Sequence, residues 1–342
     1  MSTTKIFVTQ IESVKEHTNA DALELAQIGG WQCVVRKGEY NAKEKVVYFP
    51  PDTMLSEKWT SKFGVSQYCS LKGGMRRINR TKLRGEPSFG LVVRPEHDWW
   101  EVDQDVTDYY GAKKYEPPIR CKMDNAAPED PMVPRYTDIE NLRGYTRVFI
   151  PQEEVILTEK IHGTNVRAAM IEGEKRSGSR KHMRKEPEDY TASWWWYPWS
   201  IPRFKEMMEA LGKEHNQVVA YGETFGCVQW LKYNAGNILD FRVFDMLIDG
   251  KWVDYDDCVT ICDRFGVQMV PLIARIPYDL QVIAEYSEGK TRVNGADHIR
   301  EGVVVKPVHE RTHPRVGRVI LKYVSDTYLL GKNAMKDDTS DV

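Results

Sequence analysis

The stretch Thr158-Glu159-Lys160-Ile161-His162-Gly163-Thr164-Asn165 decides which fold and chemistry we expect for this chain. It follows the apolar run Val155-Ile156-Leu157, which predicts a buried β-strand. Gly163 lets the backbone turn tightly and approach a ligand closely. Lys160, at the end of that strand, is therefore a candidate nucleophile, although a lysine three residues before a glycine is more often a surface residue beside a turn.

A nucleophilic lysine must lose its proton, and its ordinary pKa is about 10.4. Burial and neighbouring positive charges lower that pKa. Lys306 and Lys322, each at the edge of a β-rich run, are candidates for those charges, as is a divalent metal ion.

Two carboxylates stand beside glycine at the boundary of an apolar strand: Glu223 in Tyr221-Gly222-Glu223 and Glu301 in Glu301-Gly302-Val303. A charge at such a boundary faces a cleft more readily than a core. Carboxylates and water are the ligands that Mg²⁺ prefers, usually together with nucleotide phosphates. For either residue taken alone, a surface ion pair at the end of a strand is the commoner explanation.

Phe244, in Val243-Phe244-Asp245, is a candidate for stacking on a purine base. A core phenylalanine on a buried strand is the commoner explanation for such a residue, and periodicity does not decide between the two.

Length and composition favour two domains: 342 residues, 41% hydrophobic and 29% charged. In residues 1–115, about five short runs predict a small OB-type β-barrel, a fold that commonly binds oligonucleotides. These runs are 6–14, 22–28, 32–35, 45–49 and 88–93. Residues 116–134 are rich in proline and charge and predict a linker.

Residues 135–342 mix strand-like and helical runs without a βαβ repeat, which favours an α+β fold with largely antiparallel sheets flanked by helices. The strand-like runs are 155–157, 218–221, 241–248, 303–305 and 319–321, and the helical runs are 203–211 and 256–265.

Net charge is near −2, so a nucleic-acid partner would depend on local basic clusters. One such cluster consists of Arg76, Arg77, Arg80, Lys82 and Arg84. A solvated basic loop explains it as well. The aromatic string 194–199 offers stacking surface for RNA bases, but consecutive aromatics cannot all face one way, so some must pack internally.

The cysteines and the apolar runs of the sequence indicate in which cellular compartment the protein is located. Six scattered cysteines form no CxxC pair, which argues against a zinc site or a disulfide framework. The first residues lack the apolar run of a signal peptide, and no stretch approaches the roughly 20 apolar residues that span a bilayer. We therefore expect a location inside the cell and no membrane partner. Separately, we expect a monomer.

Several short motifs recur together in one order. Lys160-Ile161-His162-Gly163 is followed by Ser179-Arg180, Tyr221-Gly222-Glu223, Val243-Phe244-Asp245, Glu301 through Lys306, and Leu321-Lys322. In this order the chain resembles the covalent nucleotidyltransferase superfamily of DNA ligases, RNA ligases and RNA-capping enzymes. The histidine before Gly163 is similar to that of nick-sealing RNA ligases, whereas DNA ligases and capping enzymes typically have aspartate there.

The amino-terminal residues extend this resemblance to nearly the whole chain. Gly29-Gly30-Trp31, Tyr48 through Asp52 and Leu83 through Leu91 look like the amino-terminal OB domain of Deinococcus-type ATP-dependent RNA ligases. The resemblance implies that Lys160 carries AMP from ATP, that AMP passes to a 5′-phosphate, and that a 3′-hydroxyl then displaces it at a nick in a duplex.

The resemblance also implies roles for individual residues. Phe244 would stack on adenine, Arg180 would contact the nucleotide or RNA end, and Glu223 and Glu301 would hold the ribose or the waters of Mg²⁺ or Mn²⁺. Lys306 and Lys322 would neutralise phosphates, and His162 could orient the leaving pyrophosphate. Glu159, Gly163 and Asn165 belong to the same nucleotide-binding motif.

Two departures bear on this interpretation. The last motif often has two lysines spaced KxK, and here Lys322 stands alone between Ile320 and Val324. The sequence continues only about twenty residues beyond Lys322, too few for the carboxy-terminal domain of DNA ligases and capping enzymes. The open alternatives are a DNA ligase, a capping guanylyltransferase, or a non-catalytic RNA-binding protein.

Overall fold

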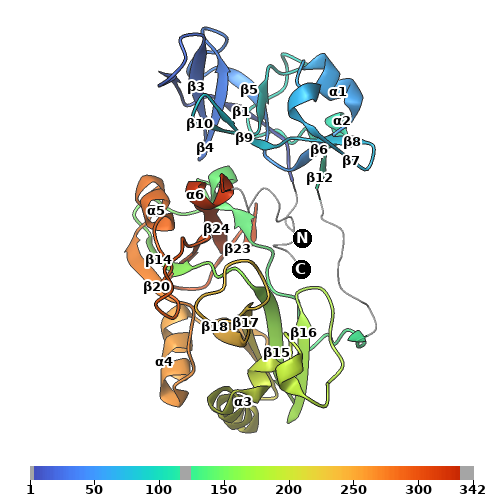
Figure 1. Cartoon of the computed structure of the whole chain (residues 1–342), viewed down its shortest axis with the longest axis vertical. Helices are drawn as coiled ribbons and strands as arrows, with labels where there is room; N and C mark the ends of the chain where they lie inside the picture. Colours follow the sequence, from blue (N-terminus) through green and yellow to red (C-terminus); the bar gives the residue numbers. More distant parts are fainter. Residues whose placement is uncertain (1–3, 116–124, 332–342) are drawn as a thin grey trace. The chain divides into compact units, whose positions relative to one another are not determined.

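Two compact units make up the chain in the computed structural model, which describes residues 4–115 and 125–331 (Figure 1). The first unit comprises Met1–Pro117 and Leu142–Thr146, and the second comprises Pro118–Asn141 and Arg147–Val342. Residues 116–124 of the expected linker lie outside the described residues. None of the helices in the described ranges combines the length and apolar composition needed to cross a bilayer.

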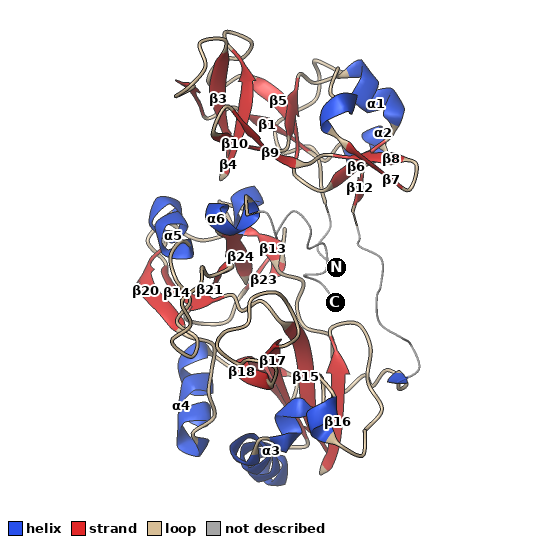
Figure 2. Ribbon diagram, viewed as in Figure 1, coloured by secondary structure: helices blue, strands red, loops and turns tan. Residues whose placement is uncertain are grey.

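Antiparallel strand pairs build the first unit (Figure 2). One sheet has the order β1-β5-β11 and another β2-β3-β4. Their strands are β1 (Phe7–Gln10), β2 (Ser13–Glu16), β3 (Leu23–Ile28), β4 (Trp31–Arg36), β5 (Lys45–Phe49) and β11 (Leu91–Val93). Every run predicted as a strand in this unit contains one. The run at 6–14 divides into β1 and β2, and the run at 88–93 divides at Gly90, which has a φ of +88°.

Residues 53–87 and 107–114 contain structure that the strand prediction missed. A four-stranded sheet has the order β12-β6-β8-β7, and β9 pairs with β10. The elements are β6 (Thr53–Leu55), α1 (Glu57–Lys62), η1 (Ser66–Tyr68), β7 (Ser70–Lys72), β8 (Met75–Arg77), β9 (Arg80–Leu83), β10 (Glu86–Phe89), α2 (Thr107–Tyr110) and β12 (Lys113–Lys114). These strands are short and mostly polar, so apolar alternation does not reveal them.

The short helix η3 (Leu142–Gly144) packs with the first unit, although the sequence boundary assigns it to the second domain. Arg143 donates from Nη1 to the Gly30 carbonyl at 3.0 Å, and its own carbonyl accepts from the Gly30 amide at 3.0 Å. A Cβ at Gly30 would lie 2.7 Å from the Arg143 Cα, so only glycine permits this approach.

Two five-stranded sheets dominate the second unit, and helices flank them (Figure 2). The first sheet has the order β13-β24-β21-β14-β20 and is antiparallel except for the β13–β24 pair. Its strands are β13 (Glu140–Asn141), β14 (Glu154–Glu159), β20 (Leu272–Pro277), β21 (Gly302–Pro307) and β24 (Leu321–Val324). The second sheet has the order β16-β15-β17-β18-β19. Its strands are β15 (Thr164–Ile171), β16 (Glu174–Ser179), β17 (Gln217–Gly226), β18 (Leu239–Ile248) and β19 (Lys251–Trp252).

Helices and a hairpin complete this unit: η4 (Tyr190–Ala192), η5 (Tyr197–Ser200), α3 (Pro202–Glu214), α4 (Tyr255–Phe265), α5 (Leu280–Ser287), β22 (Thr312–His313), β23 (Gly317–Arg318) and α6 (Asp326–Leu329). The two predicted helices are confirmed in α3 and α4. In α3, Phe204, Met207, Met208 and Leu211 are buried at helical spacing against the second sheet. Trp196 and Trp199 from the aromatic string join this core, as internal packing requires.

Candidate active site

A cavity of about 900 Å³, including its open mouth, lies in the second unit and receives side chains from both sheets. β14, β21 and β24 contribute from the first sheet, and β15, β17 and β18 from the second. The sequence candidates that line it are Glu159, Lys160, Asn165, Arg180, Glu223, Phe244, Lys306 and Lys322. The fold thus brings together residues that are far apart along the chain.

Lys160 follows the last residue of β14, where its amide donates to the Gly302 carbonyl at 3.0 Å. Its Nζ donates to Oε1 of Glu301 at 2.6 Å. Burial of Glu301 favours the neutral acid, but Lys160 and His162 outweigh it and hold the pKa of this carboxyl at about 2. Lys160 therefore pairs with an ionised carboxylate in the ligand-free protein.

Glu223 lies on β17 beside the nucleophile motif. Burial, together with the negative charge of Glu301, raises the pKa of Glu223 to about 8 despite the opposing charge of Lys160. Its Oε1 accepts a hydrogen bond from the Gly163 amide at 3.0 Å. A Cβ on Gly163 would lie 2.2 Å from the Thr224 carbonyl oxygen, so glycine is needed for this close approach.

Phe244 and Asn165 supply an aromatic face and an amide to the cavity. Phe244 is half-buried, and the ring of Tyr136 meets it edge-on at a centroid distance of 4.9 Å. The Oδ1 of Asn165 is buried and has no hydrogen bond to any described residue. A polar atom in that state is suited to a ligand that completes its hydrogen bonding.

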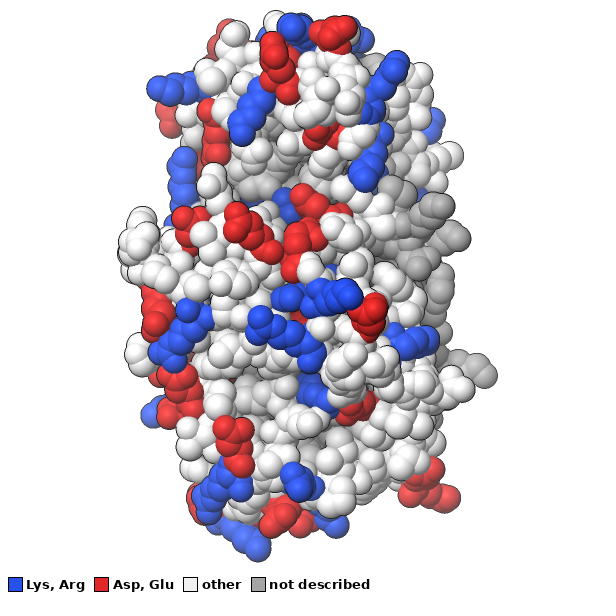
Figure 3. Space-filling view, turned by 60° about the vertical axis from the view of Figure 1, so that its left-hand side comes forward, with Lys and Arg blue, Asp and Glu red and all other residues white. Residues whose placement is uncertain are grey.

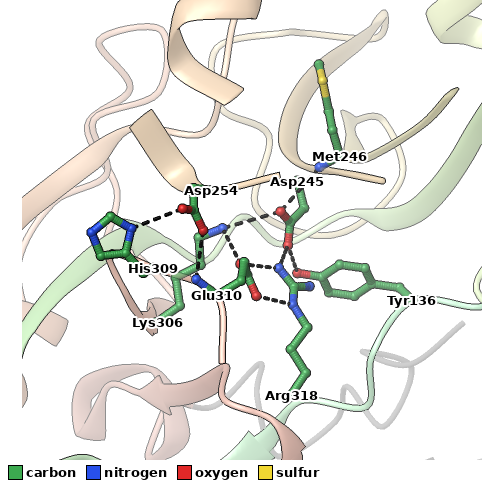
Figure 4. A network of polar contacts seen from close by, with 8 residues as sticks. All are labelled: Tyr136, Asp245, Met246, Asp254, Lys306, His309, Glu310 and Arg318. Atoms are coloured by element: carbon green, nitrogen blue, oxygen red, sulfur yellow. Dashed lines mark hydrogen bonds and ion pairs between the residues drawn. The ribbon is translucent and has the colours of Figure 1, made fainter. Parts of the chain in front are cut away.

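Lys306 lines the cavity, but its ammonium points into a buried ion-pair network (Figure 4). Its Nζ lies 3.3 Å from a carboxylate oxygen of Asp245 and 3.3 Å from one of Glu310. Burial alone would lower the pKa of Lys306, but these carboxylates raise it above its ordinary value. Lys306 is thus a fixed positive charge in the cavity wall.

Arg318 shares the same two carboxylates. Its Nη2 lies 2.6 Å from Asp245 Oδ2, and its Nε donates to Glu310 Oε2 at 2.6 Å. Tyr136 donates its hydroxyl to Asp245 Oδ2 at 2.8 Å. Buried Asp245 and partly buried Glu310 therefore compensate two buried bases behind the cavity.

His162 is buried next to Glu301. Its Nδ1 lies 3.4 Å from Glu301 Oε2 and 3.3 Å from the Tyr328 hydroxyl oxygen. Its backbone amide donates to the Tyr233 hydroxyl at 2.6 Å. Lys160 and His162 therefore contact opposite oxygens of one carboxylate.

Glu159 and Arg180 already have partners within the protein. The Glu159 carboxylate accepts from the Thr291 hydroxyl and, at 2.7 Å, from the Arg292 amide. Arg180 donates to Asp138. Glu159 thus anchors the loop before β21, an interaction that its place in the motif did not indicate.

Sequence reasoning missed several residues that surround the cavity without lining it, among them Trp230, Tyr233, Glu310, Arg318 and Tyr328. They come from loops, a two-residue strand and a short helix, and none stands in a recognisable motif. Their proximity to the motif residues arises only from the fold.

A family model described as RNA ligase matches residues 153–324, which is half of the chain and contains all the cavity-lining residues except Tyr136, Thr137 and Ile139. The chain belongs to the RNA ligase family. An OB-fold domain model matches residues 5–95, which confirms the predicted fold of the first unit. No curated protein sequence matches the chain.

Solved structures of an RNA ligase from Naegleria gruberi share the fold. A mutant bound to AMP and Mn superposes with a TM-score of 0.77 at 20% sequence identity, and the match covers 95% of this chain and 97% of that chain. The complex with PPi gives a TM-score of 0.77 at 20% identity, with 96% and 98% coverage. The predicted α+β architecture, an OB fold followed by an RNA ligase domain, is therefore confirmed.

Proposed function

We propose that this protein is an ATP-dependent RNA ligase that stores AMP on Lys160 and joins a 3′-hydroxyl to a 5′-phosphate at nicks in duplexes. One observation carries the proposal: the Lys160 Nζ lies 2.6 Å from buried Glu301, beside a cavity that also presents Phe244, Lys306 and Lys322. A nucleophile, an aromatic face and several cations are what adenylyl transfer requires.

The first step is an in-line substitution at phosphorus. Lys160 loses a proton, and its amine attacks the α-phosphorus of ATP. A P–N bond forms, the bond from the α-phosphorus to the bridging oxygen breaks, and pyrophosphate leaves with the electron pair. AMP then passes to the RNA 5′-phosphate, and the 3′-hydroxyl displaces it. Such reactions depend on positioning and charge stabilisation more than on further covalent chemistry.

The cavity residues divide these tasks. Phe244 would stack on adenine, while Asn165 and Glu223 would accept hydrogen bonds from the nucleotide. Lys306, Lys322 and Arg180 would balance the phosphate charge, and His162 would orient the leaving group. Lys306 would act from the cavity wall, because Asp245 and Glu310 hold its ammonium in the ligand-free protein.

Glu223 and Glu301 fit a divalent cation, Mg²⁺ or Mn²⁺. Both are carboxylates next to the nucleophile, and Oε2 of Glu301 is buried without a hydrogen bond to the described residues. Carboxylates combined with substrate phosphates suit these ions. The cation would supply positive charge to the phosphates. The Naegleria structures described as bound to ATP and Mn and to PPi support this substrate and cofactor assignment.

Incubation with α-labelled ATP or GTP and a divalent cation tests the proposal. We expect label to remain on the denatured protein after ATP and not after GTP. Retention from GTP alone would indicate a capping guanylyltransferase, and no retention from either nucleotide would indicate a non-catalytic RNA-binding protein.

Sealing of nicked duplexes that carry RNA or DNA on each side of the nick tests the substrate. We expect sealing when the 3′-hydroxyl strand is RNA. Efficient sealing of all-DNA nicks with no preference for RNA would contradict the proposal in favour of a DNA ligase.

The residues of the basic cluster in the first unit differ in burial and in their contacts. Arg77 is buried, donates to Asp52 at 2.6 Å and lies 4.1 Å from the Tyr115 ring centroid. Lys82 and Arg84 are exposed on the β9–β10 hairpin. On the face shown in Figure 3, basic and acidic side chains are interspersed, so attraction of RNA would be local.

We propose that Lys82 and Arg84 bind RNA phosphates and that Arg77 is structural. Replacing both exposed residues with alanine is expected to weaken RNA binding and to reduce the slope of log affinity against log salt by about 1 for each phosphate that is no longer neutralised. Anisotropy titrations at several salt concentrations measure both quantities. In contrast to the double variant, Arg77→Ala is expected to lower the melting temperature, because it removes the ion pair that buried Arg77 makes with Asp52. An unchanged affinity and slope in the double variant would show that the hairpin is only a solvated loop.

A further inference from the structure

The loop between β17 and β18 approaches the nucleophile motif. Gln229 donates its side-chain amide to the Gly163 carbonyl at 3.4 Å, and the hydroxyl of Tyr233 accepts from the His162 amide at 2.6 Å. Tyr233 is itself fully buried. The loop is therefore tied to the backbone on both sides of the His162 side chain.

Trp230, from the same loop, packs against the His162 imidazole edge-on at a centroid distance of 5.6 Å. It also stacks on Tyr328 of α6, with centroids 5.6 Å apart and planes 16° from parallel. The Tyr328 ring meets His162 at 5.7 Å, and its hydroxyl oxygen lies 3.3 Å from Nδ1. The imidazole thus lies against two stacked aromatic rings.

These interactions act on Lys160 through one carboxylate. His162 Nδ1 lies 3.4 Å from Oε2 of Glu301, and Oε1 of the same group accepts from Lys160 at 2.6 Å. Oε2 makes no hydrogen bond to the described residues, so a displaced imidazole would remove this ionic contact and leave the hydrogen bond from Lys160 to orient the carboxylate. The aromatic rings restrict the orientation of the imidazole but carry no charge. The ionic contacts of His162 and Lys160 are therefore those with Glu301.

We infer that Trp230 and Tyr328 are positioning residues, which hold His162 against Glu301 so that Lys160 is aligned for transfer of AMP. This inference rests on the proposed function. It predicts that the two aromatic residues act on adenylyl transfer only through His162, and not through binding of the nucleotide, because neither lines the cavity.

A double-mutant cycle between Trp230 and His162 tests the inference, with single-turnover formation of lysyl-AMP as the readout. We expect Trp230→Ala to slow this step by about 10- to 100-fold, since small misplacements near reacting groups have effects of that size. The dissociation constant for ATP should change by less than about twofold, and Trp230→Phe should restore most of the rate. In a His162→Ala background, Trp230→Ala should have no further effect, because coupled residues are not additive.

A second double-mutant cycle pairs His162→Ala with Tyr328→Phe, which removes only one hydroxyl. This cycle tests the inference even if Trp230→Ala fails to fold. Tyr190→Phe is its matched control, because the Tyr190 hydroxyl donates to Glu186 at an exposed site. The inference would be wrong if the rate losses from the Trp230 and His162 substitutions multiplied in the double variant. It would also be wrong if Trp230→Ala weakened only ATP binding. Neither result would contradict the proposed function. Absence of labelling in the unaltered protein would overturn the proposed function as well.

Discussion

Lys160→Ala is expected to abolish covalent attachment of AMP, with a decrease of at least about 10⁴-fold in the rate of labelling. The methyl group has no lone pair to attack phosphorus. Lys306, also in the cavity wall, is a poor substitute because Asp245 and Glu310 hold its ammonium. Mass spectrometry of the intact chain after incubation with ATP and a divalent cation measures the added AMP.

A control variant and a pre-adenylylated substrate test whether the effect of Lys160→Ala is specific to the first step. Lys213→Ala removes an exposed lysine near the end of α3 and should leave labelling unchanged. A nicked duplex that already carries AMP on its 5′-phosphate bypasses the first two steps, so Lys160→Ala should still join it. Full labelling of Lys160→Ala would show that the nucleophile lies elsewhere.

The chemistry of the site could be predicted from the sequence because it resides in short motifs. Lys160, Glu223, Phe244 and Glu301 each adjoin or lie within a strand-like run, and their order along the chain limits the folds that would join them. The structure places all but Glu301 on the cavity and places Glu301 against Lys160. Strand alternation then explains the facing residues: Val304 and Lys306 share one face of β21.

The pairings of the same residues could not be predicted. The motif predicts that Lys306 reaches phosphates, yet its ammonium binds Asp245 and Glu310, and the second base of that network comes from the β23 strand. Glu159 belongs to the nucleotide motif but holds the loop at Thr291. The hydrogen-bond partners of a residue depend on which loops the tertiary fold brings near it. Local sequence periodicity does not predict those neighbours.

Arg318→Met is expected to lower the free energy of unfolding by about 3–5 kcal/mol at neutral pH. The methionine keeps much of the buried volume but leaves the carboxylates of Asp245 and Glu310 with Lys306 as the remaining base of the network. The stacking of the guanidinium on Trp252, 3.8 Å from the ring centroid, is removed as well. Urea unfolding measures the change, and hydrogen exchange of β18 amides locates it in the second unit. Arg315→Met, exposed in the same hairpin, should change stability by less than about 0.5 kcal/mol.

The pH dependence of this destabilisation distinguishes charge from packing. Burial would raise the pKa of Asp245, but Lys306 and Arg318 hold it below its ordinary value. A depressed carboxyl pKa contributes stability above the pKa of the unfolded chain, and that contribution disappears as pH falls through the pKa of the folded state. Without Arg318 the depression is smaller, so the stability difference between the two proteins should narrow below about pH 4. A difference that stays constant with pH would mean that Arg318 stabilises the fold by packing on Trp252 and not by its charge.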